Sequence, residues 1–239
     1  MTWSILARDG DGTFGVAIAS RFFAVGALCV HTRHAAGALS TQALMNPLYG
    51  QVGIDRLAAG ESAGAVVSAV TSADAGRDHR QLHVVGARGA PAAFTGAACI
   101  GWCGHRIEAD CSVAGNMLSG PAVIDETARV FGQTAGRPLA ERLLAAMAAG
   151  QAAGGDKRGQ QAAALRIHGS EDYPSLDLRV DDHATPLDEL ARLYRVSLER
   201  FQWFVACLPR RDDPVGLTDR SEIEARIEQL RASASPPIG

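Results

Sequence analysis

Alternation of apolar and polar residues over the first 45 positions predicts β-strands separated by turns. Residues 3–7 and 13–20 are apolar and rich in β-forming side chains, and the RDGDG segment between them has turn-forming residues. These segments predict a β-hairpin with Thr2 at its open end. Residues 27–33 and 36–44 follow at similar spacing, so we expect a single four-stranded antiparallel meander.

Helical spacing of apolar residues replaces this alternation between Pro47 and about Ala73. Gly60 is a suitable helix stop and Ser62 a suitable N-cap, so the segment is predicted to hold two helices. Strands are expected again further along, in a second sheet. Their predicted positions are 81–87, 91–99 and 110–118.

Two prolines mark the next change of pattern. Pro121 and Pro138 each fit the first position of a helix, and apolar faces follow both. The predicted elements are helices over 122–131 and 139–149, a glycine-rich loop over 150–161, and strands over 162–169 and 175–180. Because strands and helices come in separate runs, the order favours an α+β layered fold with antiparallel sheets over a doubly wound fold.

The last quarter of the chain is predicted to be helical. After Thr185 and Pro186, apolar residues recur every three or four positions as far as Leu208. The PRRDDPVG segment ends this helix, and Ser221 with Glu224 has the pattern of a capping box for a final helix. We therefore expect a domain over residues 1–182 and a C-terminal helical hairpin over 183–239, with SASPPIG as a frayed tail.

Packing or oligomerisation is the expected role of this hairpin. Phe201, Trp203, Phe204 and Val205 lie close together, so apolar residues occur on more than one side of the helix. One apolar face then remains after packing on the domain. The pattern predicts a homodimer, or a higher homo-oligomer, that uses this helix.

Composition and charge exclude several classes of partner. The 239 residues are 47% apolar and carry a formal net charge of −3, with the charges scattered along the chain. This distribution argues against nucleic acid and against an anionic membrane surface as partners. No apolar run reaches the roughly 20 residues of a membrane span, and no secretory signal precedes the first strand, so we expect a cytoplasmic protein. Five cysteines without a regular framework are expected to be reduced thiols.

Several segments resemble one family over about residues 2–182. They are TWSILARD, GVAIASRFFAVGA, STQALMNPLYG, TGAACIGWCGH, GNML and AAGGDKRGQQAAAL. They are similar to the DUF1028 family, which is classed with the Ntn-hydrolase-like proteins. The resemblance implies an αββα sandwich, in which two antiparallel sheets lie between helical layers. The family has no settled substrate. We expect no cofactor.

Thr2 is the candidate nucleophile if Met1 is removed. In N-terminal nucleophile hydrolases the side chain of the first residue attacks an amide carbonyl, and its own α-amine, with an unperturbed pKa of about 7.7–8.0, acts as the base. The resemblance therefore implies an amidohydrolase that acts on a small amide. Threonine is also an ordinary strand residue. The alternative is a non-catalytic member of the fold that binds a small ligand or serves in an assembly.

Other residues are candidates for supporting this chemistry. Asn116 ends a predicted strand, where its amide could stabilise an oxyanion or only satisfy its own turn. Lys157 is the only lysine, so the lysine that assists proteasome-like threonine hydrolases is missing from the first 156 residues. Arg21 or Arg33 would supply positive charge instead, although a guanidinium cannot shuttle protons.

Polar residues that interrupt apolar strands suggest where a substrate binds. Thr41 and Gln42 form a buried polar pair that requires partners. Asp156 and Arg158 could clamp an amino-acid-like substrate or form a solvated salt bridge. Because the start of the first strand adjoins the end of the second, and a second sheet can bring Asn116 over both, these side chains are expected to share one pocket. That pocket would hold Thr2, Arg21, Thr41, Gln42 and Asn116.

Four potential zinc ligands lie in one short stretch of the sequence. Cys99, Cys103, His105 and Cys111 give the unfamiliar spacing C-x3-C-x-H-x5-C, and small buried thiols explain the cysteines more simply than a metal does. We therefore predict no bound metal. The chain has no P-loop, Rossmann fingerprint, GxSxG elbow or HExxH motif, which argues against the common nucleotide-binding, α/β-hydrolase and zincin functions.

Overall fold

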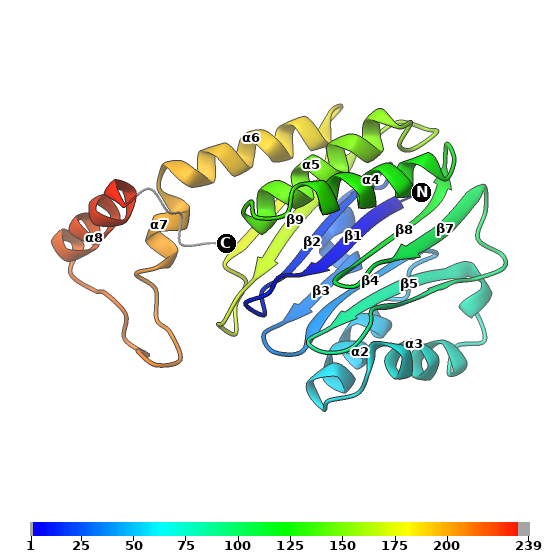
Figure 1. The fold of residues 1–239 in the computed structure, drawn as a ribbon, viewed down its shortest axis with the longest axis horizontal. Coiled ribbons are helices and arrows are strands. Elements are labelled where there is room, and N and C mark those ends of the chain that lie inside the picture. Colours follow the sequence, from blue (N-terminus) through cyan, green and yellow to red (C-terminus); the bar gives the residue numbers. More distant parts are fainter. Residues whose placement is uncertain (1, 234–239) are drawn as a thin grey trace.

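A computed structural model describes residues 2–233, and it contains two antiparallel sheets (Figure 1). Met1 and residues 234–239 fall outside the described part, and with them the predictions about Met1 removal and the frayed tail. The six-stranded sheet has the order β10-β9-β2-β1-β8-β7. Its strands are β1 (Thr2–Arg8), β2 (Phe14–Ser20), β7 (Trp102–Ile107), β8 (Cys111–Leu118), β9 (Ala162–His168) and β10 (Leu176–Val180).

The four-stranded sheet has the order β3-β4-β5-β6. Its strands are β3 (Val30–Arg33), β4 (Gly37–Ala43), β5 (Arg80–Gly86) and β6 (Ala92–Thr95). The two sheets contact each other through β1 with β4 and β5 with β8. Helices α2 (Leu48–Ala58) and α3 (Ala63–Ser72) pack on this sheet, whereas α4 (Ala122–Gln133) and α5 (Leu139–Ala152) pack on the six-stranded one (Figure 1).

Strand alternation explains why β1 lies at the centre of this arrangement. Trp3 and Ile5 point toward α4 and α5 and join the largest apolar cluster, together with Leu143 of α5. The intervening residues, such as Leu6, point toward the second sheet. Because both faces of β1 are covered, nearly all of its side chains are buried, and the strand is fixed from both sides.

The predicted hairpin of β1 and β2 is confirmed, but the single four-stranded meander is wrong. Residues 25–29 form the short helix α1 (Val25–Cys29), which contacts β2 and β9 of one sheet and β4 of the other. The chain therefore passes between sheets at this point, so β3 pairs with β4, and β4 with β5, instead of extending the first hairpin. A short apolar run has the same appearance in a buried helix and in a buried strand, which is why the sequence pattern predicted a strand from residue 27.

The second group of predicted strands is also divided between the sheets. β5 and β6 belong to the four-stranded sheet, but β8 pairs with β1 in the six-stranded sheet. Strand β7, over residues 102–107, was not predicted. It is an edge strand whose residues are half-buried or exposed, so it lacks the alternation of a covered strand.

The predicted helices are present, with small differences at their ends. Gly60 follows α2 at φ 91°, and the Ser62 hydroxyl caps α3 by accepting the amide N–H of Ala65 at 3.2 Å. Pro121 and Pro138 occupy the N-cap positions of α4 and α5 instead of the first helical positions. A shift of one residue is within the ordinary uncertainty of helix boundaries.

The C-terminal segment contains three helices instead of two. These are α6 (Pro186–Glu199), α7 (Phe201–Val205) and α8 (Arg220–Ala232). The break falls at Arg200, and Asp219, instead of Ser221, caps α8 by accepting two backbone N–H groups. The stripe of α6 packs on β9 and β10, Trp203 is buried, and Phe201 is 48% exposed. The homodimer and the domain boundary after residue 182 stay predictions.

Candidate active site

Thr2, Ser20 and Asn116 lie side by side at one edge of the six-stranded sheet. Thr2 is the register partner of Ser20 on β2 and of Asn116 on β8. Directly opposite residues point to the same face of a sheet, so all three side chains point into the layer between the sheets. The Thr2 Oγ1 and Ser20 Oγ atoms are 3.0 Å apart, and the three residues are 6%, 0% and 2% exposed, respectively.

The Asn116 amide is held by residues of the second sheet. Its Nδ2 donates to Gln81 Oε1 at 3.0 Å, and Gln42 Nε2 donates to the same oxygen at 2.7 Å. Gln81 is itself fixed, because its Nε2 donates to the Gly115 carbonyl at 2.9 Å and to the Gly104 carbonyl at 3.0 Å. Only one Asn116 amide hydrogen is engaged by this contact, so the group retains a second N–H for a ligand.

A buried hydrogen-bond chain continues from Gln42 through the layer between the two sheets. Ser4 Oγ donates to Gln42 Oε1 at 2.7 Å and lies 2.8 Å from His83 Nε2, and His83 Nδ1 lies 3.1 Å from Ser112 Oγ. Burial lowers the pKa of His83 to about 3, with a smaller contribution from His105. The imidazole is therefore neutral at physiological pH, where it links the two sheets without carrying charge.

The glycine-rich loop meets the same edge of the sheet. The side chain of Asp156 is fully buried, and its carboxylate accepts the backbone N–H groups of Arg158 at 2.7 Å and Arg21 at 3.2 Å. The Arg158 guanidinium is 3.6 Å from this carboxylate, and that of Arg21 donates to the carbonyl of Gln160 at 3.4 Å. With exposed Lys157, the loop region combines three cationic side chains with one carboxylate.

Two buried oxygen atoms near this loop lack hydrogen-bond partners. Within residues 2–233, neither Gln151 Oε1 nor Gln160 Oε1 has a partner. Gln160 contacts Arg21, as described above, and Gln151 lies against Gly155, one residue before Asp156. Leaving a buried acceptor without a hydrogen bond costs stability. The two acceptors lie in the region of the loop that adjoins the end of β1 where Thr2 lies, which fits a site that a ligand or water completes.

The structure brings together most of the predicted site residues but not all of them. Gln42 and Asn116 meet through Gln81, Thr2 lies opposite Asn116 on the next strand, and the backbone N–H of Arg21 contacts Asp156 of the adjoining loop. Thr41 is placed elsewhere. Neighbouring residues of a strand point to opposite faces, and the Thr41 hydroxyl accepts the backbone N–H of Asn46 at 3.1 Å on the face away from Gln42.

The route by which Asn116 reaches Thr2 also differs from the prediction. Asn116 does not approach from the second sheet but lies on the strand next to β1. Ser4, Gln81 and His83 also belong to this cluster but were not predicted as site residues. Their signal is present in the sequence, because Gln81 and His83 are polar residues two positions apart in an otherwise apolar strand and therefore share one buried face.

The four candidate zinc ligands do not converge. Cys111 lies in the apolar cluster under α4, where burial raises its pKa to about 12. His105 Nδ1 is 2.9 Å from Thr95 Oγ1 of the other sheet, and Cys103 Sγ contacts the carbonyl of Cys99. Across residues 2–233 there is no group of three or more His, Cys, Asp or Glu side chains that could hold a metal ion.

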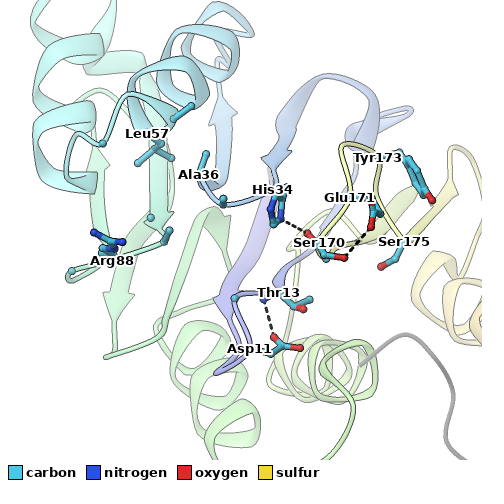
Figure 2. Close-up of a pocket in the computed structure, with 18 of the residues that line it drawn as sticks. Asp11, Thr13, His34, Ala36, Leu57, Arg88, Ser170, Glu171, Tyr173 and Ser175 are labelled. Carbon is cyan, nitrogen blue, oxygen red and sulfur yellow. Dashed lines mark hydrogen bonds between the residues drawn. The ribbon is translucent and has the colours of Figure 1, made fainter. Parts of the chain in front are cut away.

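A separate cavity of about 1000 Å³ lies at the opposite end of the sheets (Figure 2). Its lining includes Asp11 and Thr13, in the turn between β1 and β2, so the length of β1 separates it from Thr2. Its lining does not include Thr2, Ser20 or Asn116. We therefore assign the candidate active site to the Thr2 edge by its chemistry and consider the cavity separately. None of the helices between residues 2 and 233 is long and apolar enough to span a bilayer.

The molecule is thus an α+β protein with two antiparallel sheets and a hydroxyl–amide cluster at the start of its central strand. Residues 2–190 match DUF1028, a family of unknown function, and the chain belongs to this family. Protein SPO2555 from Silicibacter pomeroyi, also of DUF1028, has a crystal structure that is similar to this one, with a TM-score of 0.84. The two sequences are 30% identical, and the match covers 92% of this chain and 96% of that one.

A second solved structure is less similar. Anbu (ancestral beta-subunit) from Yersinia bercovieri is 12% identical with a TM-score of 0.40, and the match covers 82% of this chain and 95% of that one. No curated protein is significantly similar to the chain.

Proposed function

We propose that the protein is an Ntn-type amidohydrolase that cleaves a small amide with Thr2 as its nucleophile. The observation that carries the proposal is the placement of Thr2, Ser20 and Asn116 opposite one another on three adjacent strands. The proposal also includes a finer fold assignment, namely a four-layer αββα sandwich of the Ntn-hydrolase-like class. The helices packed on the outer faces of the two contacting sheets support that assignment.

The chemistry requires that everything preceding Thr2 be removed, so that its α-amine is free. The amine then takes the proton of the Thr2 hydroxyl while Oγ1 attacks the amide carbonyl. The resulting tetrahedral oxyanion is stabilised by the second N–H of Asn116 and by backbone amides. Transfer of the proton from the α-amine to the leaving amine breaks the C–N bond and forms an ester on Thr2, which water then hydrolyses.

Neighbouring residues have distinct proposed roles. Ser20 orients the Thr2 hydroxyl through the 3.0 Å contact. Arg21 supplies positive charge at the edge of the site, and Arg158, whose side chain is 44% exposed, is the better placed of the clamp residues to contact substrate. Asp156 is already engaged with backbone N–H groups, so in the proposal it shapes the loop against the site.

The test uses a chain released from a cleavable fusion so that it begins at Thr2. We expect β-butyrolactone to acylate the hydroxyl and to add its whole mass, because ring opening leaves no fragment. A hydroxylamine-sensitive ester mapped to Thr2 would support the proposal. Thr2→Ala should give no such ester, whereas Thr134→Ala, in which a hydroxyl bonded within a helix is lost, should react like the wild type.

The matched control retains one glycine before Thr2, which removes the free amine next to the hydroxyl. This chain should react at least about tenfold more slowly, given the contribution expected of a positioned general base. Equal reactivity of the free and extended chains would exclude the mechanism. In protein purified from its own cells, an intact mass that still includes residues before Thr2 would exclude it as well. A screen of small amides with wild type and Thr2→Ala would then identify the substrate class.

Two observations favour a non-catalytic alternative, in which the chain binds a small ligand or serves in an assembly. Thr2 is only 6% exposed, and the lone lysine lies in the glycine-rich loop instead of on a strand beside it. In that case the Thr2→Ala and wild-type chains would be equally inert toward the lactone and toward every amide tested.

A further inference from the structure

The cavity at the far end of the sheets is formed by segments distant in the sequence. Figure 2 shows the β1–β2 turn, the residues before β4, the turn after β5 and the loop between β9 and β10 around one space. The end of α7 and the segment after it form another part of the wall, through Val205, Ala206 and Arg210. The volume of the cavity, about 1000 Å³, is at the upper end of the range for small-molecule sites, roughly 300–1000 Å³.

Hydrogen bonds fix the walls of this cavity in place. Arg8 Nη1 donates to the carbonyl of Gly86 at 2.9 Å and holds the β5–β6 turn against β1. On the other side, Tyr173 Oη donates to the Pro209 carbonyl at 2.8 Å and ties the β9–β10 loop to the C-terminal segment. The cavity is therefore preformed, which reduces the entropic cost of binding a ligand.

The carboxylates that line the cavity already have partners. Asp11 accepts the backbone N–H of Thr13 at 2.8 Å. Glu61 forms an ion pair with Arg56 at 2.6 Å, and Glu171 accepts the backbone N–H of Arg211 at 3.0 Å. The carboxylates thus help to hold the lining together: Glu61 and Glu171 each pair with an arginine, and Asp11 is bonded within its own turn.

Two donors that line the cavity are, by contrast, available, whereas Arg210 is paired with Glu171 and Asp212. Within residues 2–233, neither the Arg88 guanidinium nor the Thr13 hydroxyl has a hydrogen-bond partner, although Thr13 is only 7% exposed. His34 Nδ1 donates to the Gly169 carbonyl at 2.9 Å, so this ring nitrogen is already engaged. Figure 2 shows Thr13 and His34 on the same side of the space, and Arg88 on another wall.

We propose that this cavity binds a small organic anion whose carboxylate, phosphate or sulfonate meets the Arg88 guanidinium and whose body carries a second polar group that reaches the Thr13 hydroxyl on another wall. Among the described residues the Arg88 guanidinium has no partner, and charge-assisted hydrogen bonds to such anions are the strong ones. The lining also includes apolar residues such as Ala36, Leu57 and Val205, so part of the ligand's body is apolar. The site is independent of the proposed chemistry at Thr2.

The probe for this site is 1-anilinonaphthalene-8-sulfonate, which joins an apolar ring system to an anionic group. Calorimetric titration of the full chain is expected to show one saturable site. Arg88→Gln should weaken binding at least about fivefold, because it removes the charge-assisted contact with the sulfonate. Thr13→Val should weaken it about two- to fivefold, the scale of one neutral hydrogen bond, here to the anilino N–H of the probe. Arg88→Lys, which keeps the charge, should retain more affinity than Arg88→Gln.

Arg195→Gln is the matched control, because Arg195 is an exposed arginine of α6 outside the cavity. Its affinity for the sulfonate should remain within about twofold of the wild type. N-phenyl-1-naphthylamine has the same rings without the sulfonate and should bind at least about fivefold more weakly. Equal binding of the two probes, or sulfonate affinities for Arg88→Gln and Thr13→Val within twofold of the wild type, would overturn the proposal. Thermal unfolding of each variant confirms that it is folded.

Discussion

The two faces of β1 are both buried, yet they contact different kinds of side chain. On the outer face, Trp3 and Ile5 pack against α4 and α5 in an apolar cluster. On the inner face, Thr2 and Ser4 are bonded to polar residues of neighbouring strands and of the second sheet. Apolar packing is nondirectional and contributes most of the stability, whereas hydrogen bonds contribute little net stability but fix geometry. One strand thus combines a stabilising face with a positioning face.

The largest expected effect comes from breaking the outer face. Trp3→Ala removes a fully buried indole from the apolar cluster and should lower the free energy of unfolding by about 3–5 kcal/mol. Urea denaturation measures this change. Trp102→Ala, in a half-buried position on edge strand β7, is the matched comparison and should cost distinctly less. Equal losses for the two variants would contradict the assignment of the stabilising face.

Acid should act on the inner face through His83. Its pKa is lowered in the folded protein to about 3 from 6.5, chiefly by burial, so between these pH values the unfolded chain binds the proton and the folded chain does not. Stability is therefore fully present above pH 6.5 and falls as the pH decreases, by about 1.4 kcal/mol per pH unit for one proton. Urea titrations from pH 7 to pH 4 test this, and His83→Gln should flatten the slope.

A smaller loss is expected when the inner network loses its central amide. Gln81→Leu leaves the Asn116 and Gln42 amides without their shared acceptor and should cost about 1–3 kcal/mol in unfolding free energy. It should also slow acylation of Thr2 by β-butyrolactone, because Asn116 is no longer held. The control is Gln133→Leu on the exposed side of α4, which should change neither quantity. If folded Gln81→Leu were acylated as fast as the wild type, the hydrogen-bond network around Gln81 would not contribute to the reaction at Thr2.

The smallest effect is expected for Thr41, whose side chain lies on the opposite face of β4 from that of Gln42. Thr41 and Gln42 are sequence neighbours, but the Thr41 hydroxyl accepts the backbone N–H of Asn46 on the opposite face. Thr41→Val should cost about 0.5–1.5 kcal/mol and leave the lactone reaction unchanged. Gln42→Leu should slow the reaction instead, because it removes one of the groups that hold Gln81. A slower reaction in Thr41→Val would place that hydroxyl in the site.

Local patterns predicted the elements better than their partners. The hairpin at the N-terminus and the helices with Ser62 and the two prolines at their starts could be predicted, because turn and capping residues act within a few positions. The assignment of strands to sheets could not, since α1 diverts the chain through contacts with β9, more than 130 residues later. Edge strand β7 was missed because half-exposed residues lack a clear alternation.

The same limit applies to the candidate site. Thr2 and Asn116 could be selected by residue type, since nucleophiles and amide donors are few in kind. Their direct pairing depends on the β1–β8 register, which no local pattern specifies. Gln81 could have been found from its spacing to His83 on one strand face. The cavity near Arg88 could not, because its walls come from segments that adjoin only in the folded chain.

The strand order also determines when during synthesis the Thr2 edge can form. β1 is flanked by β2, which follows it directly, and by β8, which begins at Cys111, while the glycine-rich loop ends near residue 161. Pairings between distant segments form slowly and wait for the later segment to leave the ribosome, at about 5–20 residues per second. Thr2 therefore stays without Asn116 and Asp156 until those segments have been synthesised, and the proposed acylation of Thr2 can begin only after that.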